Sequence, residues 1–517
     1  MQAENIPRQV VQVPLAVDYE DRDAGTIYTG ASPLGRPDAQ LYNMYPEVVH
    51  DPLANSVKTT IRQRFAQQAT TNQPANSAQF LYWWSNAQSL ISTSLVNGIY
   101  YTQDPNSFTW NNLNTVGNGI VNITDAESIA TSTGAPVLFL WNPGSAHLGA
   151  VPKLYIVTNN LGALTLTNTI TPTISSNSCT DSLVWFDNYV FIWDRNGNIY
   201  NSNLNDPTTW NGASFFNTNS YNDQPVRLER NLNYLIAFKS YSIDFLYDAG
   251  NPTLTPLAKA VGLTIKMGCN NPGSVRSHNE KIYFVAQNRN GYQGIYSLSN
   301  IAQLQKISNF AVDRKIKALG GAPAITNIRP FSLDGHTFLM VPQINMMYCV
   351  DSQKWVVVNF PNGTPQEIVY SFQDYYISDN VLPGFSTGVN KLYSIDSSNI
   401  VNTLSSSVYQ DKNSVGTLTN YTKAIQTPRL DFGTNKRKVI DRVELLGDFN
   451  GNTISMTAYD DDYQTTSSTG RTISMNYPKA VFYTGGSPRR RAYTFIDSGS
   501  QALRLSGIEI EYEVCED

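Results

Sequence analysis

The stretch Ile-Tyr-Asn-Ser-Asn-Leu-Asn-Asp-Pro-Thr-Thr-Trp at residues 199–210 begins with the feature that decides the fold, an aliphatic residue followed by tyrosine. Seven such pairs recur with their tyrosines 45 to 55 residues apart: Ile99-Tyr100, Leu154-Tyr155, Ile199-Tyr200, Leu246-Tyr247, Ile295-Tyr296, Met347-Tyr348 and Leu392-Tyr393. A period near 50, with Gly and Asn-rich turns between short strands, is typical of a β-propeller, because each four-stranded blade is one repeat. The repeat predicts an all-β protein with a propeller of about seven blades.

The residues after several of these tyrosines also recur, as an acidic turn residue followed by a tryptophan. Asp begins a tight turn and Trp offers a large apolar face, so we expect these side chains to pack the blades. A sugar-binding or catalytic tryptophan is the alternative, but repetition across blades favours packing. The blade-packing candidates are Tyr100, Asp104, Trp110, Tyr200, Asp206, Trp210, Tyr348, Asp351 and Trp355.

Three segments are predicted from the pattern of the chain. Residues 1–78 are broken by prolines and are expected to form an N-terminal arm that joins a platform and orders on assembly, with one short helix over residues 54–69. Residues 79–405 hold the repeat and are expected to form the propeller. Residues 406–517 predict a C-terminal β-sandwich or platform domain, with strands at 430–450, 453–460, 471–475, 480–484 and 503–514.

Residues that would carry catalysis or bind a metal are sparse. The chain has four histidines and four widely spaced cysteines, and none of them has a partner at a recognisable motif spacing. Asp460, Asp461 and Asp462 could ligate a cation or supply paired carboxylates, but a solvated turn between two strands is the favoured interpretation. We therefore expect a protein that is not an enzyme and that needs neither a metal nor a cofactor.

Targeting signals are missing from the printed sequence. Its first residues lack the basic and apolar stretches of a secretory signal, and no apolar run approaches the roughly 20 residues that span a bilayer. We expect a protein without a membrane span that is assembled in a cytoplasm.

Charge is low and uneven. Charged residues make up 15% of the chain and the net charge is −5, which argues against tight general binding of nucleic acid. Two basic triplets nevertheless lie near the C-terminus: Lys436, Arg437 and Lys438, and Arg489, Arg490 and Arg491. They could dock an acidic partner or neighbouring subunit, contact phosphate, or form a solvated edge that discourages strand pairing, and docking suits a net-acidic chain best. Charge reversal at 489–491 is then expected to block docking and leave the monomer folded.

Several segments resemble one family in order along the chain. They are residues 38–47 with Tyr-Pro-Glu, 227–250 with Ala-Phe-Lys and Ser-Ile-Asp-Phe, 267–284 with Gly-Cys and Ser-Val, 305–313 with Lys-Ile-Ser, and 335–355 with Gly-His, Tyr, Asp and Trp. Together they resemble the tail hub and nozzle proteins of short-tailed (podoviral) phages, also called packaged-DNA stabilisation proteins. The resemblance spans residues from about 38 to 400.

This resemblance implies a structural virion protein of the phage tail. Its relatives close the portal end of the head, typically as a homohexameric ring below the portal-adaptor, retain the packaged DNA and later conduct it outward. The implied partners are other copies of the chain, the portal-adaptor protein, tail fibre, spike or needle proteins, and double-stranded DNA in transit without tight binding. A neutral to acidic bore suits that transit, because phosphate contacts would slow it.

The alternative is a carbohydrate-active propeller, either a sialidase-like hydrolase or a lectin. Residues 202–210 are similar to the Asp-box turn of sialidases, but they differ in spacing and lack its glycine. The arginine cluster and tyrosine nucleophile of such an enzyme cannot be assigned to positions in this sequence.

Overall fold

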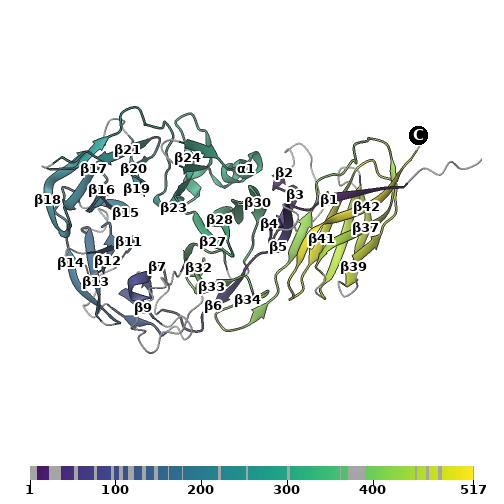
Figure 1. Cartoon of the computed structure of the whole chain (residues 1–517), viewed down its shortest axis with the longest axis horizontal. Helices are drawn as coiled ribbons and strands as arrows, with labels where there is room; N and C mark the ends of the chain where they lie inside the picture. Colours follow the sequence, from purple (N-terminus) through teal and green to yellow (C-terminus); the bar gives the residue numbers. More distant parts are fainter. Residues whose placement is uncertain are drawn as a thin grey trace, which may run out of the picture.

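The computed structural model describes most of the chain and shows a ring-shaped propeller joined to an elongated sandwich (Figure 1). The described residues are 8–21, 37–51, 56–74, 78–94, 98–103, 109–113, 122–130, 136–144, 150–160, 162–176, 178–218, 223–251, 254–299, 303–360, 363–370, 391–448, 451–460, 465–474 and 480–515.

Five blades of the propeller are separate antiparallel sheets of four strands, each in chain order. Blade one consists of β7 (Phe80–Trp84), β8 (Ser89–Ser94), β9 (Gly98–Thr102) and β10 (Asn111–Asn112). Blade two consists of β11 (Asp125–Ala130), β12 (Pro136–Asn142), β13 (Lys153–Asn160) and β14 (Ala163–Ile170). Blade three consists of β15 (Cys179–Phe186), β16 (Tyr189–Asp194), β17 (Asn198–Asn203) and β18 (Asp206–Asn217). Blade four consists of β19 (Pro225–Asn231), β20 (Tyr234–Lys239), β21 (Ile243–Asp248) and β22 (Leu257–Lys259). Blade five consists of β23 (Val275–His278), β24 (Lys281–Gln287), β25 (Gln293–Ser299) and β26 (Gln303–Lys306).

Blades six and seven are parts of larger sheets. Blade six consists of β27 (Arg329–Leu333), β28 (His336–Val341), β29 (Met346–Cys349) and β30 (Lys354–Val357). Blade seven consists of β31 (Glu367–Tyr370), β32 (Leu392–Ile395), β33 (Val401–Ser405) and, from the N-terminal segment, β6 (Ala66–Ala69). β6 pairs antiparallel with β33, and it also carries the short strands β34 (Asp411–Lys412) and β35 (Leu418–Thr419). The described residues thus form the expected seven blades, and a strand from near the start of the chain completes the last one.

Hairpin chemistry explains why the blades form where they do. The turns between the first and second strands of blades three, five and six place two successive residues at positive φ, namely Asp187-Asn188, Asn279-Glu280 and Asp334-Gly335. Two-residue turns of this kind match the twist of the flanking strands, and Asn, Asp and Gly tolerate the left-handed conformation best. The first strands of successive blades contact one another around the ring, from β11 through β15, β19, β23 and β27 to β31, and β31 contacts β7.

The described helical elements are short. α1 (Phe310–Leu319) lies between blades five and six, where Val312 and Ile316 are buried. Asn309 caps its N-terminus by accepting from the Val312 N–H over 2.9 Å, and Gly320 ends it at a φ of 117°. The 3-10 turns are η1 (Ser85–Ala87), η2 (Pro272–Ser274), η3 (Ala322–Ala324) and η4 (Pro342–Ile344). No described helix has the length and apolar character needed to cross a bilayer.

The sandwich combines both ends of the chain. One sheet contains β4 (Met44–Asp51), β5 (Ser56–Gln63), β42 (Arg504–Val514), β37 (Lys438–Asp448) and β40 (Ala480–Tyr483), with β1 (Gln9–Pro14) paired to β42. The other contains β3 (Pro37–Tyr42), β36 (Lys423–Gln426), β41 (Arg491–Asp497), β38 (Thr453–Asp460) and β39 (Thr465–Ser474), with β2 (Glu20–Asp21) paired to β3. β3 also pairs in parallel with β30 at Tyr42 and Val357, so this sheet is continuous with blade six.

The N-terminal segment, for which we expected an arm that joins the platform, contributes strands to both the sandwich and the propeller. β1, β3, β4 and β5 lie in the sandwich and β6 lies in the propeller. Residues 54–69 contain strands β5 and β6 rather than the predicted helix, because their pairing with β4 and β33 decides the conformation. One hydrophobic core runs through both parts, and it includes Met340 of blade six, Leu404 of blade seven and Ile510 of the sandwich.

Candidate functional site

The two basic triplets come together in space. Residues 436–438 lead into β37, and residues 489–491 lead into β41. The Lys438 N–H donates to the Pro488 carbonyl oxygen over 3.0 Å, which holds the two segments side by side. Both lie at the end of the sandwich away from the propeller, near the end of β42 (Figure 1).

Lys438 is a structural member of this group. It is 1% exposed, and its Nζ donates to the carbonyl oxygens of Thr434, Lys436 and Arg489 at 2.6, 2.8 and 2.6 Å. A buried ammonium surrounded by carbonyls is satisfied within the domain, so Lys438 joins the two triplets and does not present its charge outward.

Arg491 is also buried. Its Nε and Nη2 donate to the two carboxylate oxygens of Asp460 at 2.6 and 3.1 Å, and Nη2 also donates to the Gly485 carbonyl at 2.7 Å. We therefore revise the expectation that charge reversal at 489–491 leaves the monomer folded: at Arg491, reversal would bury two carboxylates side by side. The surface cations that remain are Lys436, Arg437 and Arg489, which are exposed, and Arg490, which is half-buried; we call these four the basic tip.

The blade-packing candidates divide by chemistry. Among the aromatic members, Tyr100, Tyr200, Tyr348, Trp210 and Trp355 are buried and Trp110 is half-buried. Tyr200 and Trp210 belong to a core that blade three shares with blade two, and Tyr348 and Trp355 belong to one shared by blades five and six.

The aspartates have different roles. The Asp206 carboxylate accepts from the backbone N–H of Thr208 over 3.0 Å and so organises its own turn. Asp351 is exposed and interacts with the ring of His336 over 3.0 Å from its Nδ1 atom, so it does not pack between blades. Asp104 lies outside the described residues.

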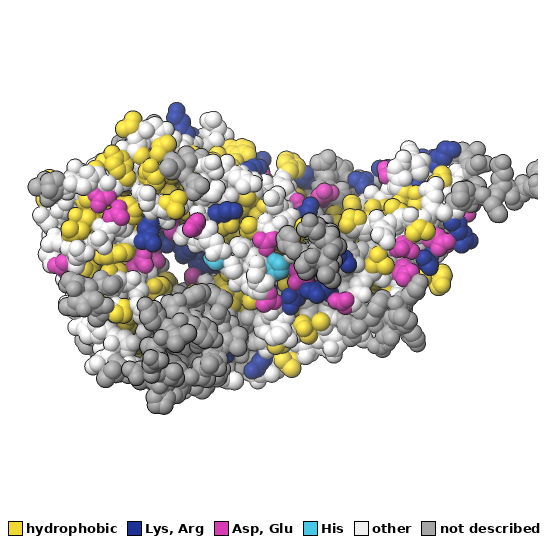
Figure 2. Space-filling model, in the orientation of Figure 1, with side chains coloured by type: hydrophobic (Ala, Val, Ile, Leu, Met, Phe, Trp, Pro, Cys, Tyr) yellow, Lys and Arg dark blue, Asp and Glu magenta, His cyan; other side chains and the backbone are white. Residues whose placement is uncertain are grey.

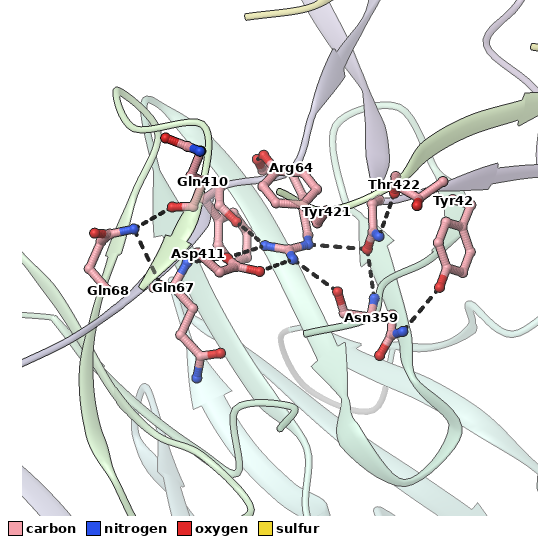
Figure 3. A network of polar contacts seen from close by, with 11 residues as sticks. Tyr42, Arg64, Gln67, Gln68, Asn359, Gln410, Asp411, Tyr421 and Thr422 are labelled. Carbon is pink, nitrogen blue, oxygen red and sulfur yellow. Dashed lines mark hydrogen bonds and ion pairs between the residues drawn. The ribbon is translucent and has the colours of Figure 1, made fainter. Parts of the chain in front are cut away.

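A buried polar network, which the sequence did not predict, joins the propeller to the sandwich (Figure 3). Arg64 follows β5 and precedes β6, and its Nη1 and Nη2 donate to Asp411 Oδ1 and Oδ2 over 3.0 and 2.6 Å. Arg64 Nε also donates to Asn43 Oδ1 over 3.1 Å, and its guanidinium carbon lies 3.8 Å from the centroid of the Tyr421 ring. Strands of the sandwich and of blade seven are therefore tied by one guanidinium group.

A second charged group crosses the same junction. Glu47 of β4 pairs with Arg504 of β42 over 2.5 Å and with Arg62 of β5 over 3.6 Å. Arg62 in turn reaches Asp334 in the β27–β28 turn of blade six over 3.2 Å. Together with the Arg64 network, these contacts resist movement of the propeller relative to the sandwich.

The axis of the propeller carries a ring of charges that we did not predict from sequence. A charged residue stands at or near the start of the first strand in six consecutive blades: Asp125, Asp181, Arg227, Arg276, Arg329 and Glu367. We call these six residues the channel ring. The spacing of these charged residues is visible in the sequence, where each follows the previous one by 38 to 56 positions. Only the strand register of the blades shows that they occupy equivalent positions in successive repeats.

Four members of the channel ring, Asp125, Arg227, Arg276 and Glu367, line a cavity of about 380 Å³. It is lined by residues from six blades, among them Tyr82, Glu127, Arg230 and Ser277, and Figure 2 shows basic and acidic side chains beside the hollow in the propeller. Burial, reinforced by the Asp125 carboxylate, raises the pKa of Glu127 to about 7. Burial and the guanidinium groups of Arg227 and Arg329 lower the pKa of Arg276 to about 9.

Other reactive groups form no further site. Cys179, Cys269 and Cys349 are buried, and burial raises the pKa of each thiol, which leaves these side chains unreactive. Across the described residues, no group of three or more His, Cys, Asp or Glu side chains could hold a metal ion. Asp460 forms an ion pair with Arg491, and Asp461 and Asp462 lie outside the described residues.

Comparisons with known proteins point to a phage family. The family model described as bacteriophage P22 Gp10, β-propeller, matches residues 95–361, just over half of the 517 residues. The search of curated proteins found no match.

The comparison with solved structures gives matches at low similarity. An exo-β-1,3-galactanase from Phanerochaete chrysosporium with galactose is 11% identical, with 77% of this chain and 97% of that chain covered and a TM-score of 0.29. The N-terminal domain of Nup159 is 10% identical, with 70% and 98% covered and a TM-score of 0.38. These likenesses carry no argument about activity.

Proposed function

Because this chain belongs to the bacteriophage P22 Gp10 β-propeller family and is thus a phage structural protein, we propose that it forms the tail hub or nozzle of a short-tailed phage. In this role, copies of the chain form a ring, most simply a hexamer, below the portal-adaptor protein. The ring retains the packaged DNA and later provides the channel for its ejection. The observation that carries the proposal is the family match over residues 95–361, which runs from the third strand of blade one to the end of blade six.

The charge of the chain supports a conduit for DNA. The net charge is −5, and the basic tip lies at one end of the sandwich. DNA that must leave quickly should meet few cationic contacts, since each phosphate contact adds affinity through counterion release.

The basic tip is our candidate for docking a neighbour. Its four cations lie close together on two joined segments, at the end of the molecule farthest from the propeller (Figure 1). Complementary charge speeds encounter and fixes register, so we propose that the tip meets an acidic surface of an adjacent subunit or of another tail protein.

The rigid connection between the propeller and the sandwich supports a structural role in the tail. A ring that closes a pressurised head needs each subunit to keep its shape, and the propeller and sandwich share a sheet, a hydrophobic core and the buried Arg64 network. Interfaces between domains that slide or rotate are generally smaller and more polar.

The test is assembly of the tail in vitro. DNA-filled heads carrying the portal-adaptor are mixed with the purified protein, and retention is measured as protection of the DNA from nuclease. We expect the wild-type chain to protect the DNA and the variant Arg437→Glu/Arg489→Glu to lose attachment to the heads. The matched control is Lys281→Glu/Lys317→Glu, which makes the same charge change at two exposed propeller positions.

Three outcomes would be decisive. Failure of the wild-type chain to attach or to protect DNA would overturn the tail proposal. Protection by wild type and by both variants would keep the tail proposal and remove the basic tip from it. Binding to a glycan array, or turnover of a fluorogenic glycoside, together with no attachment to heads, would favour the carbohydrate-active alternative.

A further inference from the structure

The channel ring has an uneven arrangement of charge. Going round the propeller from blade two to blade seven, the six residues are two acids, three arginines and one acid. Three successive blades therefore carry an arginine near the start of the first strand: Arg227 and Arg276 line the cavity, and Arg329 follows in blade six. Like charges held this closely at a partly buried site repel one another unless anions lie between them.

The outer two arginines have such anions. Arg227 Nη2 lies 3.0 Å from Asp125 Oδ2, and its Nε donates to Glu229 Oε1 over 2.6 Å. Arg329 Nη2 donates to Glu367 Oε2 over 2.5 Å. Arg227 and Arg329 are thereby paired with carboxylates.

Arg276 has none. Among the described residues it forms no ion pair, and its one hydrogen bond is from Nη1 to the carbonyl oxygen of its own neighbour Val275 over 3.3 Å. The Nε atom of Arg329 next to it is also buried without a hydrogen-bond partner. A guanidinium has five N–H donors, so most of the donor capacity of Arg276 is unused by the protein.

We propose that the propeller channel binds a small oxyanion, a phosphate or carboxylate group, on the guanidinium of Arg276. Such a group would accept two parallel hydrogen bonds from the planar fork, and its charge would separate the three arginines. This inference does not depend on the tail assignment.

The cavity limits what the ligand can be. About 380 Å³ accommodates a small molecule, but not a DNA duplex. The carboxylates of Asp125, Glu127, Glu229 and Glu367 also line the cavity and repel an extended polyanion, so a compact anion placed against blade five fits the charges best.

The experiment is calorimetric titration of the full chain in chloride buffer with phosphate, and separately with acetate. Arg276→Gln is the test variant, and Arg289→Gln, at a 63% exposed side chain, is the matched control. We expect binding of one ion per chain to wild type and to Arg289→Gln, weakened by about tenfold or more in Arg276→Gln through loss of charge-assisted hydrogen bonds. Which of the two ions binds more tightly identifies the chemical class.

A thermal measurement separates binding from a structural role of the side chain. Saturating phosphate should raise the Tm of wild type by about 2 °C and should not raise that of Arg276→Gln. Without added oxyanion, Arg276→Gln should be at least as stable as wild type, since it removes one of three like charges. The proposal is overturned if millimolar phosphate and acetate both fail to bind wild type, or if Arg276→Gln binds them as wild type does.

Discussion

Arg64 and Asp411 are 347 residues apart in sequence and form a two-point ion pair whose side chains are both completely buried. The pair lies where the N-terminal strands cross from the sandwich to the propeller, beside β6 and β34. Asp411 Oδ1 also accepts from the Gln67 backbone N–H over 2.8 Å, so this carboxylate holds in place the strand that completes blade seven. The pair thus links the sandwich to the propeller, and it holds β6 in blade seven so that the propeller ring is closed.

Removing one partner of this pair should be costly. In Asp411→Asn the Arg64 guanidinium stays buried without a countercharge, and we expect the free energy of unfolding to fall by about 3–5 kcal/mol. The double variant Arg64→Met/Asp411→Leu should recover much of that loss, because no charge is then left buried. Urea denaturation of both variants checks this, and a loss below about 1 kcal/mol in Asp411→Asn would contradict the role we assign to the pair.

The Glu127 carboxyl should make stability depend on pH. Its pKa is raised to about 7 from the ordinary value of 4.5, so the folded state binds more protons than the unfolded state between those values. The contribution of this carboxyl group to the free energy of unfolding is therefore greatest below about pH 4.5, and it is lost as the pH rises through about 7. Glu127→Gln should stabilise the protein by roughly 1–2 kcal/mol at pH 8, allowing for water in the cavity, and have little effect at pH 4.5. Urea melts of both proteins across this range test the sign, and an equal difference at both ends would refute it.

Arg491 and Arg489 of the second basic triplet should contribute unequally to stability. Arg491→Glu places a carboxylate against Asp460 in a buried site and should destabilise the sandwich by about 3–5 kcal/mol. Arg489→Glu changes an exposed side chain and should alter stability by no more than about 0.5 kcal/mol. Thermal unfolding followed by circular dichroism compares the two, and similar losses in both would show that the tip itself stabilises the fold.

Substitutions within the repeated tyrosine, aspartate and tryptophan pattern should differ in how much they lower the free energy of unfolding. Trp355 is 1% exposed, its Nε1 donates to the Ile307 carbonyl over 2.8 Å, and its ring lies 5.0 Å from that of Tyr348. Trp355→Ala should lower the free energy of unfolding by about 3–5 kcal/mol. Asp351→Ala at the exposed end of the same repeat should cost about 0.5 kcal/mol or less. Equal effects in denaturant melts would mean that the aspartate packs the blade after all.

The period of the tyrosine pairs, together with the acidic turn and the tryptophan that follow several of them, predicted the propeller, because each pair marks one blade and blade cores repeat. Alternation also located several strands of the C-terminal part of the sandwich: the segments predicted at 453–460, 480–484 and 503–514 correspond to β38, β40 and β42. β41 (Arg491–Asp497) was missed, and this omission left Arg491 among the surface cations. Its first residue is charged, and only the pairing with β38 and β36 shows that the strand is central and buried.

The sequence by itself determined the repeat, the seven-bladed propeller and a C-terminal β domain, since strands and turns follow from local pattern and spacing. Tertiary structure alone decided that residues before 70 complete blade seven and the sandwich, that Arg64 meets Asp411, and that charged residues from four blades of the channel ring line one cavity. Those relationships depend on which strands pair and on the register of each blade. The energies of such long-range contacts come from burial and charge pairing between residues hundreds of positions apart, which no local pattern encodes.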